Sequence, residues 1–145
     1  AERAEAERAI RKRRDITATQ KETLVQARRG QGRFRGDLER VESRCRVTGL
    51  TQLDLLRASH IKPWAKCSNR ERVDPNNGLL LAPHVDVLFE LGYITFTGNG
   101  RLNVSKRLDP AVARAWRLKA GQSVGTFSKA QKSYLTYHRR LRFKR

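Results

Sequence analysis

The chain has 145 residues, a length that fits one domain with a modest core and is short for two ordinary ones. Charged residues make up 32% of it and its mean hydropathy is -0.71, so we expect a soluble protein with a polar terminal stretch. No apolar run approaches membrane-spanning length, and residues 1–14 contain no apolar signal segment. These observations exclude a membrane-embedded protein and favour the cytoplasm.

The positive charge is large and unevenly distributed. The chain has 32 Lys and Arg against 14 Asp and Glu, a formal net charge of +18, and residues 101–145 contain 13 of these bases against one acid. Such a surplus favours binding to a polyanion through counterion release and predicts strong salt dependence. Nucleic acid is therefore the expected partner. A membrane surface is disfavoured because the basic segments have no apolar face, whereas composition alone leaves RNA open as the polyanion.

The first forty residues predict helices. Residues 1–14 are rich in helix formers and poor in large apolar side chains, which is typical of a solvated helix or arm. The spacing of Thr19 and Glu22 fits a capping box, so we expect a short helix from there to Gly30, a natural helix stop. A second helix should follow, and its apolar stripe consists of Phe34, Leu38 and Val41.

The rest of the chain alternates short apolar runs with turn residues, which indicates mixed α and β structure. Cys45 to Val47 alternates in polarity before a turn at Thr48 and Gly49. We then expect, in chain order, an extended segment 53–61, a polar loop 63–76, a strand 78–81, a helix from Pro83 to Gly92, a hairpin of 93–96 and 101–104, and two helical pieces within 109–145. The two cysteines, Cys45 and Cys67, form no CxxC pair, and we expect both to be small buried residues.

Two of the three histidines, His60 and His84, lie in the nearly neutral middle of this basic chain, which suggests a reactive site. A neutral imidazole can take the proton of a water molecule that attacks phosphorus. Hydrolysis of a phosphodiester also needs a cation that stabilises the leaving oxygen and a group that orients the imidazole.

Two carboxylates on the predicted helix 83–92 are candidates for holding that cation. Asp86 and Glu90 would lie about 40° apart on one helical face, whereas His84 would lie about 160° from Asp86. Oxygen ligands suit a hard ion such as magnesium. The alternative is an ordinary solvated helix face, although acidic residues are scarce in this chain.

Three ordered runs of residues carry a resemblance to a known family. They are RASHIKPW (57–64), NGLLL (77–81) and PHVDVLFELGYITF (83–96). The chain resembles the HNH endonucleases with a ββα-metal core, in the bacterial branch of restriction or defence proteins. Shorter similarities extend the resemblance to residues 29–35, 45–49 and 134–139.

The resemblance implies roles for individual residues. His60 is the general base, and Asn77 orients this base or touches the metal. The third position of the motif is Asp86 instead of a histidine, which favours Mg2+, then Mn2+, over Zn2+ or Ni2+.

The remaining metal ligands depart from the family pattern. Ser59 stands where many members have an Asp or His ligand, and Glu90 stands where this branch usually has Asp. We rank Asp86 first as a ligand, then Asn77, Glu90 and His84, with Ser59 last. The coordination set is therefore the least determined part of the predicted site.

Several basic residues and one aromatic residue are candidates for contact with nucleic acid. Trp64 is interpreted as a lid on a small core, with a base-stacking platform as the alternative. His138 is a phosphate contact or a structural residue. The predicted contacts are Arg33, Arg35, Lys62, His138, Arg139, Arg140 and Arg142.

These observations predict a metal-dependent DNA endonuclease in restriction or antiphage defence. We expect an α+β fold with a ββα-metal core, flanking helices and an additional β-hairpin, in which residues 1–29 form a basic helical arm or linker and 30–145 the nuclease domain. No base-reading motif stands out, so a fused domain or a defence-system partner should supply sequence choice. A catalytically silent nucleic-acid-binding protein and an RNA-directed nuclease remain the alternatives.

Overall fold

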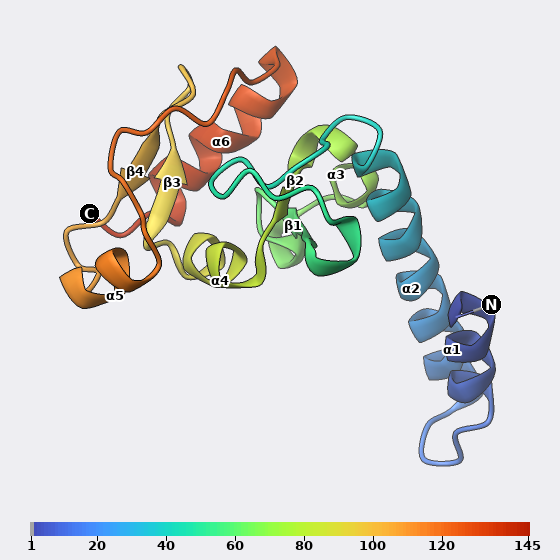
Figure 1. Cartoon of the computed structure of the whole chain (residues 1–145). Coiled ribbons are helices and arrows are strands. Elements are labelled where there is room, and N and C mark those ends of the chain that lie inside the picture. The colour runs from blue at the N-terminus through green and yellow to red at the C-terminus, as the bar shows by residue number, and fades with distance from the viewer. Residues whose placement is uncertain (1) are drawn as a thin grey trace.

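The computed structural model describes residues 2–145 and mixes helices with two small antiparallel sheets, which confirms the α+β class (Figure 1). The helices are α1 (Glu2–Arg11), α2 (Ala18–Leu38), α3 (Asn69–Val73), α4 (Pro83–Leu91), α5 (Pro110–Ala115) and α6 (Lys129–Leu141). The strands are β1 (Arg57–His60), β2 (Gly78–Leu81), β3 (Ile94–Phe96) and β4 (Leu102–Val104). Among the helices of this described part, none is both long and apolar enough to cross a membrane.

The long helix α2 differs from the prediction. It begins at a capping box formed by Thr17 and Gln20 and continues through Gly30 without interruption, so the predicted stop at Gly30 is wrong. A glycine inside a helix costs roughly 1 kcal/mol, whereas each large apolar side chain that the continued helix buries contributes about 1.5–3 kcal/mol. Phe34 and Leu38 are both fully buried, so the helix continues. Val41 lies beyond its end and is half exposed.

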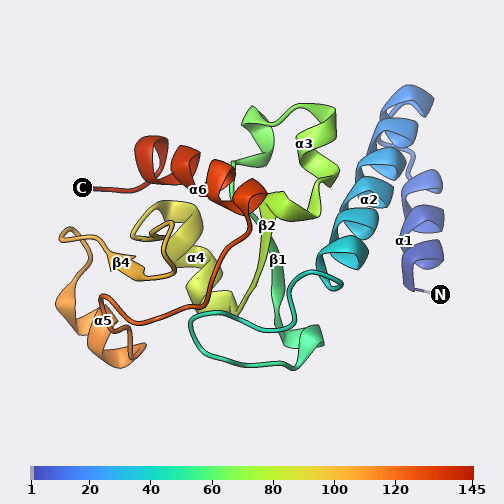
Figure 2. The same ribbon diagram turned by 90° about the horizontal axis from the view of Figure 1, so that it is seen from above.

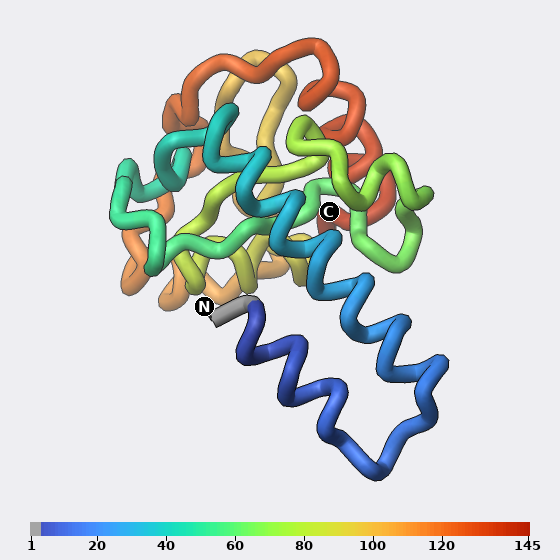
Figure 3. The backbone as a smooth tube through the Cα atoms, turned by 90° about the vertical axis from the view of Figure 1, so that its right-hand side faces the viewer, coloured from blue at the N-terminus to red at the C-terminus, as the bar shows by residue number. Residues whose placement is uncertain are grey.

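Helices α1 and α2 pack side by side as an antiparallel arm that stands out from the rest of the molecule (Figure 3). Ion pairs join the two helices, from Arg29 Nε to Glu7 Oε1 at 2.8 Å and from Arg11 Nη1 to Glu22 Oε2 at 3.3 Å. The predicted boundary between residues 29 and 30 falls inside α2, so the arm and the body share one helix.

The β1–β2 pair lies between two helices. Arg57 is opposite Leu81 and His60 is opposite Gly78 in its antiparallel register. Both α2 and α4 contact β1, and Figures 1 and 2 show them on opposite sides of the pair. Because side chains alternate along a strand, neighbouring residues of β1 face different helices. The face of β1 on which a side chain lies therefore determines which helix it meets in the candidate site.

Gly78 at the start of β2 allows α2 to approach closely. A Cβ atom at this position would lie 2.5 Å from Cζ of Phe34 and 3.1 Å from Cδ1 of Leu38. Non-bonded carbon atoms do not approach to 2.5 Å, so a side chain at this position would displace the ring of Phe34. The packing of α2 against β2 thereby fixes the ring of Phe34, which also contacts His60.

The predicted elements after residue 77 are confirmed. Strand β2 is buried along its whole length, α4 begins at Pro83, and Gly92 ends α4 in the left-handed conformation with φ 83°. The β3–β4 hairpin follows, and Figure 2 shows α6 lying along it and along α4. Cys45 and Cys67 are buried free thiols, as predicted, although residues 45–49 form a turn and no strand.

Candidate active site

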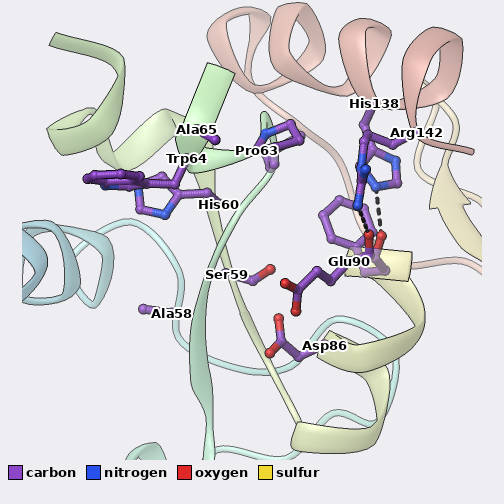
Figure 4. A pocket seen from close by; sticks show the side chains of 12 residues that line it. Ala58, Ser59, His60, Pro63, Trp64, Ala65, Asp86, Glu90, His138 and Arg142 are labelled. Carbon is purple, nitrogen blue, oxygen red and sulfur yellow. Dashed lines mark hydrogen bonds between the residues drawn. The ribbon is translucent and has the colours of Figure 1, made fainter. Parts of the chain in front are cut away.

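A pocket of about 470 Å³ opens between β1, the loop that follows it, α4 and the end of α6 (Figure 4). Its polar residues include two carboxylates, a serine hydroxyl, an arginine and two histidines. It is lined by Ala58, Ser59, His60, Ile61, Pro63, Trp64, Ala65, Asp86, Phe89, Glu90, His138 and Arg142. We call this space the carboxylate pocket.

Asp86 and Glu90 come from successive turns of α4, and their carboxylates lie side by side in the carboxylate pocket (Figure 4). The hydroxyl of Ser59, a buried residue of β1, points toward them. Within the described part of the chain, neither carboxylate accepts a hydrogen bond or forms an ion pair. Asp86 is partly buried and Glu90 is exposed, so the carboxylate oxygens are open to a cation in the pocket.

This set of donors fits a hard divalent ion. The described residues contain no group of three or more His, Cys, Asp or Glu side chains arranged to hold a metal, so the protein would supply two carboxylates and a hydroxyl. Magnesium is commonly bound through one or two carboxylates while it keeps several waters, whereas structural zinc needs a closed set of nitrogen and sulfur ligands. The residues present therefore suit magnesium or manganese better than zinc.

His60 follows Ser59 directly, and its side chain leaves β1 on the other face. The imidazole points toward Trp64 and away from Asp86 and Glu90 (Figure 4). It stacks on Phe34 of α2, with ring centroids 3.9 Å apart and planes 10° apart. The sequence led us to expect the imidazole and the Asp86 carboxylate together around one cation. The structure instead places the imidazole on the α2 side of β1 and the Asp86 carboxylate on the α4 side, although both residues line the carboxylate pocket.

The surroundings of His60 suit a neutral base. Burial lowers the pKa of the imidazole below its ordinary 6.5, so the ring is uncharged at neutral pH. Its Nε2–H donates a hydrogen bond of 2.8 Å to the carbonyl of Arg72, which leaves the lone pair on Nδ1. No described residue donates a hydrogen bond to Nδ1, so this nitrogen can accept a proton.

Asn77 is fully buried and holds the loop that follows His60. Its Oδ1 accepts a hydrogen bond of 2.9 Å from the backbone N–H of Lys62. Its Nδ2 donates to the carbonyl of Glu71 at 3.1 Å and to the Sγ of Cys67 at 3.3 Å. The amide therefore ties the loop together and forms no hydrogen bond with the His60 ring, Asp86 or Glu90. The expectation that Asn77 itself orients the imidazole or touches the metal is wrong.

His84 lies in a different place from the other candidate ligands. It sits near Trp116 with ring centroids 5.4 Å apart and an edge-to-face angle of 72°. Together with Arg117 and Val47 it lines a separate pocket. As the helical spacing predicted, His84 does not share a site with Asp86, so its inclusion among the candidate metal ligands is wrong.

The middle of the chain matches a known family. Residues 45–97 match the family model for HNH endonucleases. A search of curated proteins found no match. The matched segment runs from Cys45 to Thr97 and contains His60, Asn77 and Asp86. The match supports the HNH family for this segment, and with it a hydrolase that cleaves nucleic acid.

Outside the matched residues 45–97, the expectation that His138 contacts phosphate is wrong. The ring is 2% exposed, and both of its nitrogens are bound inside the protein. Nε2–H donates to the carbonyl of Phe89 at 2.9 Å, and Nδ1 accepts from the hydroxyl of Thr95 at 2.8 Å. Burial lowers the pKa of His138 to about 4. The residue is a neutral packing element that joins α6 to α4 and β3.

Three of the predicted basic contacts are largely occupied by the protein itself. Arg35 donates to the carbonyls of two residues before β1 and pairs with Glu39. Lys62 Nζ lies 3.0 Å from both carboxylate oxygens of Glu71, and Arg139 donates to the carbonyl of Phe96 at 2.8 Å. Partly buried cations with such partners position backbone and are poorly available to phosphate. The proposal that they bind nucleic acid is therefore weakened.

The other predicted basic contacts remain accessible. The side chain of Arg33 is 71% exposed, with Asp37 Oδ2 at 3.9 Å as a distant partner. Arg140 is exposed near the end of α6. Arg142 is exposed, lines the carboxylate pocket and donates to the carbonyl of Glu90. These three arginines are the predicted contacts that the structure leaves available to a phosphate.

Sequence reasoning did not reveal which residues surround His60. Phe34 stacks on its ring, the Arg72 carbonyl fixes its tautomer, and Trp64 lies beside it. The interpretation of Trp64 as a core residue that covers a small core is wrong, since this residue is 46% exposed. Its position four residues after His60 was the available signal. The contacts of Phe34 and Arg72 depend on tertiary packing, which local spacing does not reveal.

Proposed function

We propose that this protein is a metal-dependent endonuclease that hydrolyses phosphodiester bonds in DNA. The observation that carries the proposal is the unpartnered carboxylate pair of Asp86 and Glu90, which lies in a chain with a formal net charge of +18 and inside a segment that matches HNH endonucleases. In so basic a protein, two acids that form no ion pair within the described residues favour a metal ion as their partner.

In the proposed reaction, His60 Nδ1 takes the proton of the attacking water. The Arg72 carbonyl keeps the proton on Nε2 beforehand and stabilises the imidazolium that forms. Asp86 and Glu90, with the Ser59 hydroxyl, would hold a divalent ion. Such an ion supplies electrostatic stabilisation of the leaving oxygen. Among metals the oxygen donors favour Mg2+, then Mn2+, over Zn2+ or Ni2+.

The proposed DNA contacts are electrostatic. Arg142 at the pocket, with Arg140 and Arg33 further away, would bind phosphates, which carry no sequence information directly. Choice of target is therefore proposed to come from a fused domain or a partner. We place the activity in restriction or antiphage defence, the branch that the three sequence runs resemble.

One observation favours a second candidate, a nucleic-acid-binding protein without catalytic activity. The His60 imidazole faces α2 while the carboxylates face α4, so a phosphate in the carboxylate pocket lies on the other side of β1 from the proposed base. Binding of plasmid without cleavage in either Mg2+ or Mn2+ would select this candidate.

The test is incubation of supercoiled plasmid with the wild-type chain, His60→Ala and Asp86→Ala, in Mg2+ and in EDTA. We expect nicking in Mg2+ and none in EDTA. The rate should fall roughly 100- to 10,000-fold for His60→Ala, the usual contribution of a general base. A matched RNA duplex in parallel decides whether the enzyme prefers DNA.

Two variants serve as matched controls for this test. His84→Ala removes a histidine from a separate pocket, and Asp54→Ala removes an exposed carboxylate before β1. Both should retain the wild-type rate of nicking. Nicking by His60→Ala at the wild-type rate, or undiminished nicking in EDTA, would overturn the proposal.

A further inference from the structure

A second groove, of about 390 Å³, lies between α2 and the segment that contains α3, on the face of β1 opposite the carboxylates. Most of its lining is apolar, with amide side chains at its rim. It is lined by Thr23, Gln26, Ala27, Gly30, Gln31, His60, Trp64, Asn69, Arg72 and Val73. We call it the α2 groove. His60, the proposed base, forms part of its wall.

One wall of the α2 groove carries a fixed aromatic platform. Trp64 is 46% exposed, and the guanidinium carbon of Arg72 lies 3.8 Å from the centroid of its ring. Arg72 Nε also donates to the carbonyl of Trp64 at 3.1 Å. The indole is therefore held in place by a cation of the neighbouring helix α3, and it still presents surface to solvent. Exposed indole beside a guanidinium is well suited to stack on another flat ring.

The opposite wall leaves room for such a ring. Gly30 and Ala27 of α2 have little or no side chain, and an added Cβ at Gly30 would meet no atom within 4 Å. Gln31 and Asn69 at the rim carry amide groups that can both donate and accept hydrogen bonds. A flat aromatic ligand with hydrogen-bonding edges matches this combination of an apolar space and exposed amide side chains.

We propose that the α2 groove binds an unpaired nucleobase of the strand whose phosphate reaches His60. This inference rests on the proposed function and extends it to the class of substrate. The charge of +18 selects a polyanion, and nucleic acid is a polyanion that also carries flat rings with amide edges. Bases inside a duplex are stacked on both faces, so the preferred substrate has an unpaired base next to the cleaved bond, as in single strands or distorted duplexes.

Binding to oligonucleotides in EDTA tests this inference without any cleavage. A Trp116→Phe background leaves Trp64 as the one tryptophan, so its fluorescence reports on the groove. Single-stranded DNA should quench this fluorescence, whereas the matched duplex and an abasic strand of equal charge should not. Trp64→Ala should weaken single-strand binding roughly fivefold to 100-fold, as for other base-stacking residues, and leave duplex affinity unchanged. Trp64→Phe should restore most of the lost affinity.

A second pair of variants covers the case in which Trp64→Ala fails to fold. Gly30→Leu fills the α2 groove from the α2 side, whereas Gly36→Leu makes the same change on the same helix away from it. Neither added Cβ meets an atom within 4 Å, and leucine suits a helix better than glycine. Gly30→Leu should lose preference for the single strand, and Gly36→Leu should keep it.

The outcomes separate the two proposals. Equal affinity for single strand, duplex and abasic strand, or an unaltered preference in Gly30→Leu, overturns the base-binding groove even if plasmid is cut. Preference for the unpaired base together with a protein that never cuts in Mg2+ or Mn2+ supports the groove and overturns the nuclease.

Discussion

Ser59 and His60 are neighbours in the chain whose side chains face different helices. The sequence identified both as candidate site residues and placed two carboxylates on α4, where the structure has them. It did not reveal that the imidazole stacks on Phe34 while the hydroxyl faces the carboxylates. Which face of a short strand each residue occupies depends on its register with β2 and on the helices that cover it. Local spacing does not contain this information.

His138, a predicted phosphate contact, is a buried and neutral ring in the structure. Burial lowers its pKa to about 4, whereas the unfolded chain protonates this ring near pH 6.5. The stabilising contribution of the neutral ring is therefore complete above pH 6.5 and is lost as the pH falls toward 4. This contribution to the free energy of unfolding is on the order of 3 kcal/mol, since each unit of difference in pKa corresponds to about 1.36 kcal/mol.

We expect the free energy of unfolding, measured with urea between pH 7 and pH 4, to fall less steeply in His138→Gln than in the wild type. The glutamine keeps a polar side chain next to Thr95 and Phe89 but has no proton to bind. Parallel pH dependence in the two proteins would show that His138 does not remain neutral in the folded state.

At the scale of elements, local signals predicted the second half of the fold. Pro83 and Gly92 delimit α4, and the turn between Phe96 and Leu102 closes a hairpin, because these residues restrict the backbone wherever they occur. The first half was less predictable. Gly30 is a helix stop in isolation, but burial of Phe34 and Leu38 outweighs its cost, and that burial exists only in the folded protein.

Gly78 links the packing of α2 to the position of the proposed base. In Gly78→Ala the new methyl would lie 2.5 Å from Cζ of Phe34, and the displaced ring would disturb the His60 imidazole stacked on it. We expect a loss of stability of roughly 1–3 kcal/mol, as for other overpacked cores, with a lower rate of plasmid nicking. Thermal unfolding and nicking rates measure the two effects.

Gly98→Ala is the matched control, since an added Cβ in this loop between β3 and β4 meets no atom within 4 Å. It should behave as the wild type. If Gly78→Ala is as stable and as active as Gly98→Ala, the close contact between α2 and β2 does not position His60.

The whole molecule combines two basic ends with a nearly neutral centre. The arm of α1 and α2 stands out on one side and α6 lies on the other (Figures 1 and 3). The HNH match covers the centre, where the carboxylate pocket and the α2 groove lie on opposite faces of β1. Net charge predicted the kind of partner from composition alone. The two-sided arrangement could not be predicted, because it depends on α2 and α4 covering different faces of one strand.

The pH dependence of DNA cleavage tests the role of His60 most directly. With plasmid and Mg2+, kcat/KM of the wild type should rise as the pH passes the pKa of His60, which burial holds below 6.5, and then level off. His60→Ala should lose this rise and cut roughly 100- to 10,000-fold more slowly, while His84→Ala keeps the wild-type profile. The same rising limb in His60→Ala would contradict the assignment of His60 as the base.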